Sequence, residues 1–87
     1  FKEYDLDAYV TKVSSTGKFV MLDKGRADDL ALGRQVDVYQ VDYEGNNVLV
    51  ASGTVLKLKN QTSIIKIRKY YKKIKIKKNF IARASLR

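Results

Sequence analysis

The chain has 87 residues, of which 45% are hydrophobic, and its 18 Lys or Arg against nine Asp or Glu give a formal net charge of +9. This length fits one domain with a thin core, and the hydrophobic content excludes a disordered tail. No apolar run approaches the roughly 20 residues of a transmembrane helix, and the lack of Cys and His excludes most zinc, disulfide and acid–base catalytic sites. We therefore expect a non-catalytic domain without cofactor or metal. Because the sequence starts at Phe1, we expect it to be a fragment or C-terminal domain of a longer chain.

Glycines punctuate the sequence at intervals of eight to twelve residues, and proline is absent. Between the glycines lie short runs of Val, Ile, Leu, Thr and Tyr, which are the residue types that favour a pleated, half-buried surface. The fold class predicted from this pattern is all-β. Residues 1–87 are expected to form one small barrel of five to six mostly antiparallel strands with a short plug loop.

A hairpin is predicted at the start of the chain, with strands at residues 6–13 and 19–23. Residues 14–18 contain the serines and glycine of a tight turn, and no His is present to activate those serines as nucleophiles. Alternation places Leu6 and Val10 on the same, core-facing side of the first strand.

The segment DKGRADDLALGRQ predicts a tight or one-turn helical loop that plugs one end of the barrel. Its structural residues are two glycines that permit chain reversals, a capping aspartate and two leucines that need burial: Gly25, Asp28, Leu30, Leu32 and Gly33. Asp28 and Asp29 could hold a cation with Asp23, but the loop lacks the alternating oxygen ligands of a calcium site. We therefore predict turn and capping roles for these carboxylates.

Three more strands complete the barrel proper. Residues 36–43 and 48–59 read as a second hairpin, joined by the turn residues 44–47. Gly53, inside the longer strand, predicts a bulge or sharp bend at a barrel corner. A fifth strand is predicted at residues 64–71.

The C-terminal part of the chain carries the positive charge. Residues 51–87 contain twelve basic residues and no acid, whereas residues 1–50 contain six basic residues and all nine acids. Such asymmetry is typical of a surface that meets an anionic polymer, a membrane or an acidic protein. The predicted site for an anionic partner comprises Lys66, Arg68, Lys69, Tyr70, Lys72, Lys73, Lys75, Lys77 and Lys78.

Lys73, Lys75 and Lys77 alternate with Ile74 and Ile76, which predicts a β-ribbon with a basic outer face and an apolar inner face. The sequence NFIARA predicts a last short edge strand. An alternative interpretation is that the lysines are solvated strand faces, which pair with acids of the first half or protect strand edges from aggregation.

Two adjacent tyrosines, Tyr70 and Tyr71, lie within this basic segment. Alternation with Ile65 and Ile67 favours Tyr71 in the core and Tyr70 on the outer face of the sheet. Because bases stack on aromatic rings while ammonium groups contact phosphates, a nucleic-acid-binding barrel is the alternative function. It would act mainly through phosphate contacts, and its expected location is the cytoplasm.

The stretch VSSTGKFVMLDKGRADDLALGRQVDVYQ resembles small SH3-like β-barrel domains of bacterial cell-envelope proteins, and is similar to the C-terminal domain of the flagellar H-ring protein FlgT. The matching positions are Gly25, Ala27, Asp28, Leu30, Leu32, Gly33, Val36 and Tyr39. Asp29 stands where the family usually has a middle glycine, and Asp is among the few side chains that tolerate a left-handed backbone.

This resemblance covers residues 8–83 and implies fold more directly than activity. It implies a non-catalytic accessory domain, periplasmic or associated with the outer membrane, that packs against a protein partner in a larger assembly. On this interpretation, the basic C-terminal surface contacts an acidic partner.

Overall fold

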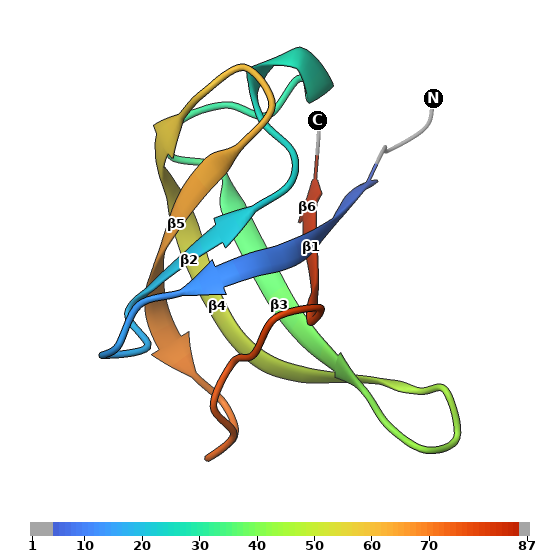
Figure 1. The fold of residues 1–87 in the computed structure, drawn as a ribbon. Helices are drawn as coiled ribbons and strands as arrows, with labels where there is room; N and C mark the ends of the chain where they lie inside the picture. The colour runs from blue at the N-terminus through green and yellow to red at the C-terminus, as the bar shows by residue number, and fades with distance from the viewer. Residues whose placement is uncertain (1–4, 86–87) are drawn as a thin grey trace.

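A computed structural model describes residues 5–85, which form six strands and one short 3₁₀ helix. In chain order the elements are β1 Asp5–Val13, β2 Phe19–Leu22, η1 Arg26–Asp28, β3 Gln35–Val41, β4 Asn47–Leu58, β5 Ser63–Tyr70 and β6 Ile81–Ser85. All strand pairs are antiparallel, and the strands close into a barrel in the order β1-β2-β5-β4-β3-β6 (Figure 1). The predicted small all-β barrel is confirmed.

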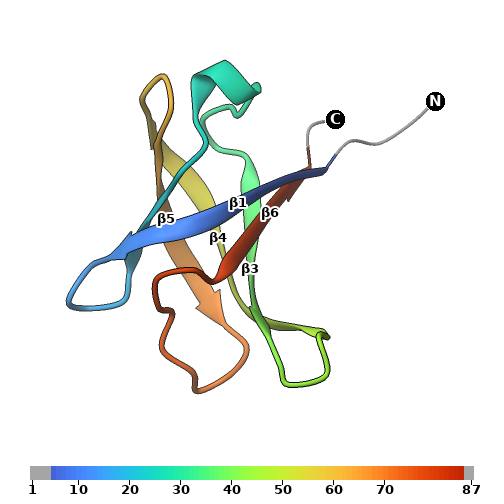
Figure 2. The ribbon, with the colours of Figure 1, turned by 45° about the vertical axis from the view of Figure 1, so that its right-hand side comes forward.

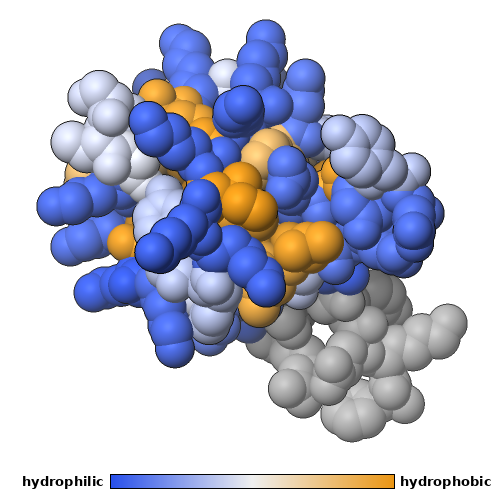
Figure 3. Space-filling view, turned by 90° about the horizontal axis from the view of Figure 1, so that it is seen from below, coloured by the Kyte–Doolittle hydropathy of each residue, from blue (hydrophilic) through white to orange (hydrophobic). Residues whose placement is uncertain are grey.

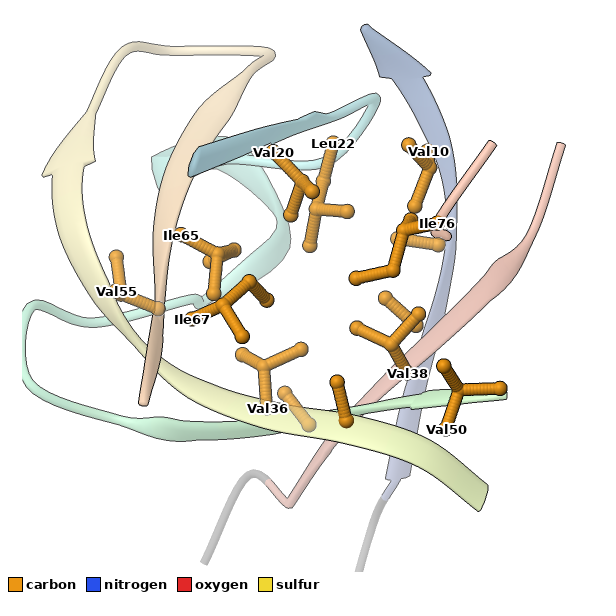
Figure 4. Close-up of a cluster of buried hydrophobic side chains, with 14 of the residues drawn as sticks. Val10, Val20, Leu22, Val36, Val38, Val50, Val55, Ile65, Ile67 and Ile76 are labelled. Atoms are coloured by element: carbon orange, nitrogen blue, oxygen red, sulfur yellow. The ribbon is translucent and has the colours of Figure 1, made fainter. Parts of the chain in front are cut away.

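The core fills the barrel with side chains from the inward positions of the strands (Figure 4). Most of these residues are β-branched, and such side chains pack well on a pleated surface. The predicted inward face of β1 is confirmed, since Val10 is buried and Leu6 packs against the core. The largest fully buried hydrophobic side chains are Leu22, Ile65, Val10, Val20, Val36, Val38 and Val50.

The turn between β1 and β2 is held by Ser14, as its residue type predicted. The Ser14 amide donates to the Phe19 carbonyl at 2.9 Å, and the Phe19 amide donates to Ser14 Oγ at 3.1 Å. Gly17 closes the turn, and its amide donates to the Ser14 carbonyl at 3.0 Å. These residues therefore have a turn role.

The plug loop holds η1 and covers one end of the barrel, with one leucine inside and one outside. Leu30 is only 3% exposed and belongs to the core, whereas Leu32 is 63% exposed. The prediction of burial is thus confirmed for Leu30 and wrong for Leu32. Leu32 lies in a turn that the Arg34 amide closes by donating to the Ala31 carbonyl at 3.3 Å, and its side chain is on the outside of this turn.

In the plug loop Asp28 caps a turn, as predicted, whereas Asp23 bonds to the backbone of β1. Asp28 Oδ2 accepts a hydrogen bond from the Gly25 amide at 3.1 Å, and Asp23 Oδ1 accepts one from the Tyr9 amide at 2.9 Å. Asp29 ends η1 in the left-handed conformation, with φ of 65° and ψ of 17°. Asp is among the few side chains that tolerate this backbone conformation.

We expect Asp29→Val to lower the free energy of unfolding by about 1 to 2 kcal/mol, because a β-branched residue is strained at positive φ. Asp29→Gly should leave stability unchanged or raise it, since glycine adopts this conformation freely. Urea denaturation of the two variants measures the difference. Equal stabilities would show that the backbone of Asp29 relaxes at no cost.

A bulge interrupts the pairing of β4 with β5 beside Gly53, as predicted. Ser52 pairs with Lys69, but the next residue, Gly53, pairs with Ile67, so Arg68 is an extra residue on the opposite strand. This irregularity helps to bend the two strands around the core, because a bulge increases local twist and curvature.

The C-terminal strand β6 lies between β1 and β3, with Ala82 paired to Ala8 on one side and to Val38 on the other. The prediction of an edge strand is therefore wrong. Strand β6 pairs with both β1 and β3 because the barrel closes, and the residue pattern of a strand does not reveal how many neighbours it has. The first residue of β1, Asp5, pairs with the last residue of β6, Ser85.

Candidate functional site

Residues 71–80, here called the lysine loop, connect β5 to β6 without forming a strand (Figure 1). The predicted β-ribbon at Lys73 to Lys77 is therefore wrong. The predicted inward position of the two isoleucines is nevertheless confirmed, because Ile76 is only 4% exposed and Ile74 packs against the core. Figure 4 shows Ile76 reaching the same cluster as Val10 and Val38.

Backbone hydrogen bonds hold both ends of the lysine loop against the barrel. The Tyr71 amide donates to the Val50 carbonyl at 2.7 Å, and the Asn79 amide donates to the Val10 carbonyl at 2.8 Å. Asn79 has a positive φ of 76°, which Asn tolerates better than most residues. The loop is thus held at its two ends and by Ile76 between them.

Five lysines of this loop are exposed: Lys72, Lys73, Lys75, Lys77 and Lys78. Within residues 5–85 no salt bridge joins any of them to an acid, whereas Arg83 Nε on β6 lies 2.8 Å from Asp7 Oδ1. The interpretation that the lysines pair with acids of the first half therefore finds no support among these contacts. Protection of a strand edge does not explain them either, because the loop is not a strand and the strands that it joins, β5 and β6, are each paired on both sides.

A groove of about 490 Å³ separates the lysine loop from the turn between β1 and β2. Residues 13–17 form one wall, residues 72–76 form the other, and Tyr70 lies between them. Seen from this end of the barrel, hydrophobic residues at the centre are ringed by hydrophilic ones (Figure 3). The site therefore combines an apolar floor with a basic rim.

Tyr70, at the end of β5, is joined to the groove wall at residues 13–17. Its hydroxyl donates a hydrogen bond to the Gly17 carbonyl. Burial raises the pKa of the Tyr70 phenol above its ordinary value, so the donor stays protonated at neutral pH. The hydrogen bond from Tyr70 to Gly17 therefore stabilises the fold at and below neutral pH, and this contribution is lost only as pH rises through the raised pKa of Tyr70.

Tyr71 does not continue the inward face of Ile65 and Ile67, so its predicted core position is wrong. The bulge at Arg68 breaks the alternation before the chain reaches Tyr71, which is 43% exposed. Lys69 Nζ lies 5.0 Å from the centre of the Tyr71 ring, within the range of a cation–π interaction. Tyr70 is exposed to a similar extent, at 42%.

The structure divides the predicted anionic site into two surfaces. Lys66 and Arg68 lie along β5, where Lys66 pairs with Phe19 and Thr54, and Arg68 Nε donates to Thr54 Oγ1 at 3.4 Å. They are not among the residues that line the groove. The groove is formed instead with the turn at residues 13–17, which sequence reasoning did not include in the site.

Residues 5–85 contain no group of three His, Cys, Asp or Glu side chains arranged to hold a metal ion. No helix within the same range is long and apolar enough to cross a bilayer.

No protein-family model matches the chain, and no curated protein matches it either. The structure shows a closed six-stranded antiparallel barrel. Its surface carries a groove with a basic rim beside the exposed lysine loop.

Proposed function

We propose that this barrel is a non-catalytic interaction domain that binds an acidic protein partner through its lysine loop. The observation that carries the proposal is the exposure of five lysines on a loop fastened to the core by Ile76, with no acid paired to them within residues 5–85. Lysines crowded within a screening length of about 8 Å repel one another. An acidic surface relieves that repulsion and is steered towards the loop by its field.

The same proposal includes the cellular location of the domain and the assembly to which it belongs. The segment DKGRADDLALGRQ resembles the plug loop of small SH3-like barrels in bacterial envelope proteins. We therefore propose that the domain belongs to a periplasmic or outer-membrane-associated assembly, such as a flagellar one. The partner is then a neighbouring subunit with an acidic face.

To test the proposal, Lys73, Lys75 and Lys77 are replaced together by Gln, and binding of a fluorescein-labelled oligo-glutamate peptide is followed by anisotropy. We expect affinity to fall by about 10-fold, at roughly 0.5 kcal/mol for each exposed charge pair. Stability should stay within about 0.5 kcal/mol or rise slightly, because like charges have been removed.

The matched control replaces Lys12, Lys57 and Lys59 by Gln, which removes the same charge from exposed positions that do not line the groove. Affinity should then fall much less than in the loop variant. Equal losses in the two variants would show binding by net charge alone. Unfolding of the loop variant would mean that the lysines are structural.

Nucleic acid remains the second candidate because Tyr70 and Tyr71 are both partly exposed among lysines. The same assay with a labelled single-stranded oligonucleotide discriminates the two candidates. Tighter binding than to the peptide, with a further loss on Tyr70→Ala, would favour nucleic acid, since stacking contributes roughly 1 to 3 kcal/mol per base.

A further inference from the structure

The groove beside the lysine loop has the dimensions and lining of a binding pocket. Its volume of about 490 Å³ lies within the roughly 300 to 1,000 Å³ typical of ligand sites. The apolar lining comes from Val13, Ile74, Ile76 and the ring of Tyr70. A hydrophobic side chain placed there would leave water for an apolar surface, which lysines alone could not offer.

This pocket is already formed in the free barrel. The Tyr70 hydroxyl joins the end of β5 to Gly17 in the wall at residues 13–17, and Ser14 fixes the turn through its hydrogen bonds with Phe19. Ile76 fixes the opposite wall because it belongs to the core. Little ordering is therefore required when a ligand enters, and this lowers the cost of binding.

The chemistry of the rim selects the occupant. Lys72, Lys73 and Lys75 stand at the mouth of the groove, next to hydroxyls of the β1–β2 turn, and no acid within residues 5–85 lines it. Each strand of the closed barrel is paired on both sides, so a ligand cannot be recognised by adding a strand to a free edge. Recognition must come from side chains, and charge complementarity calls for carboxylates around an apolar group.

We propose that the groove binds an acidic peptide segment by inserting one bulky apolar side chain, while Lys72, Lys73 and Lys75 pair with carboxylates on either side of it. This inference rests on the proposed function and specifies its partner. The apolar side chain is the anchor, as large residues in well-packed pockets dominate most interfaces. The carboxylates supply orientation and association rate.

The experiment compares two labelled peptides of equal charge, one with Phe and one with Ala between two runs of three Glu. Anisotropy is measured with the 87-residue chain at physiological salt. We expect the Phe peptide to bind about 10-fold more tightly, which corresponds to burial of much of one aromatic side chain. Equal affinities for the two peptides would overturn the inference.

A blocking variant tests the location. Ser15→Trp places an indole at the mouth of the groove and should abolish the preference for Phe without weakening the Ala peptide. Gln61→Trp is the control, because Gln61 is also exposed but does not line the groove. A preference that survives Ser15→Trp would place the anchor elsewhere and overturn the inference.

Amide chemical shifts give a second measurement that needs no variant. On addition of the Phe peptide, the largest changes should fall on residues 13–17 and 70–76, and changes centred elsewhere would contradict the inference. If both peptides bind equally and lose affinity in the lysine-to-Gln variant, the proposed function stands and the anchor pocket does not. If neither peptide binds, both are wrong.

Discussion

Replacing Gly53 with Ala should lower the free energy of unfolding by about 3 kcal/mol, and Gly53→Val by more. A Cβ at this position would lie 2.2 Å from the Lys66 carbonyl oxygen and 3.0 Å from Ile67 Cα. Both atoms belong to the backbone of β5, so neither can swing aside as a side chain would. To make room for the added Cβ, β4 and β5 must separate beside the bulge. Urea denaturation measures the resulting loss in the free energy of unfolding.

Gly45→Ala is the matched control for this prediction. Gly45 has a positive φ of 83°, but a Cβ there would meet no atom within 4 Å. Its replacement should therefore cost only the conformational strain of about 1 to 2 kcal/mol. If Gly53→Ala proved no more harmful than Gly45→Ala, the close approach of β4 and β5 would not be required for the fold.

Leu30→Ala should destabilise the barrel by about 2 to 5 kcal/mol, because it empties a buried site at the end of the core. Leu32→Ala, in the same loop and with the same chemical change, should alter stability by less than about 0.5 kcal/mol, since Leu32 is exposed. Thermal and urea denaturation of the two variants measure the contrast. Similar effects would mean that the loop does not close the barrel through Leu30.

Local signals in the sequence were sufficient to predict most of the barrel. Alternating apolar residues located β1 to β5 to within one or two residues, because a period of two is the direct signature of a half-buried strand. Gly53 predicted the bulge, since a glycine inside a strand often marks a bulge or a sharp bend. These features depend on neighbouring residues alone.

Features that depend on distant pairing were missed. The alternation around Ile76 resembled a strand, but that segment pairs with no strand within residues 5–85 and reaches the core through Ile76, with Ile74 packed against the same cluster. Leu32 was expected inside because leucines are usually buried, whereas the loop turns before reaching it. The position of β6 between two strands follows from closure of the barrel. The outward position of Tyr71 follows from the bulge at Arg68.

The candidate site was predicted only in part, for a related reason. Composition alone identified the basic residues, because their charge is concentrated in one segment. It could not separate the lysines of the loop from Lys66 and Arg68 on β5. Nor could it bring residues 13–17 to the groove, since their position depends on the pairing of β1 with β2 and of β2 with β5.

The pairing of Asp5 with Ser85 makes the barrel suitable for circular permutation. The first residue of β1 and the last residue of β6 are direct neighbours, and β1 and β6 run side by side (Figure 2). A short Gly-Ser linker could join them, while new termini open in the exposed β3–β4 turn at residues 42–46. Neither cut nor linker touches the groove, so a permuted chain could be fused to a reporter through the β3–β4 turn.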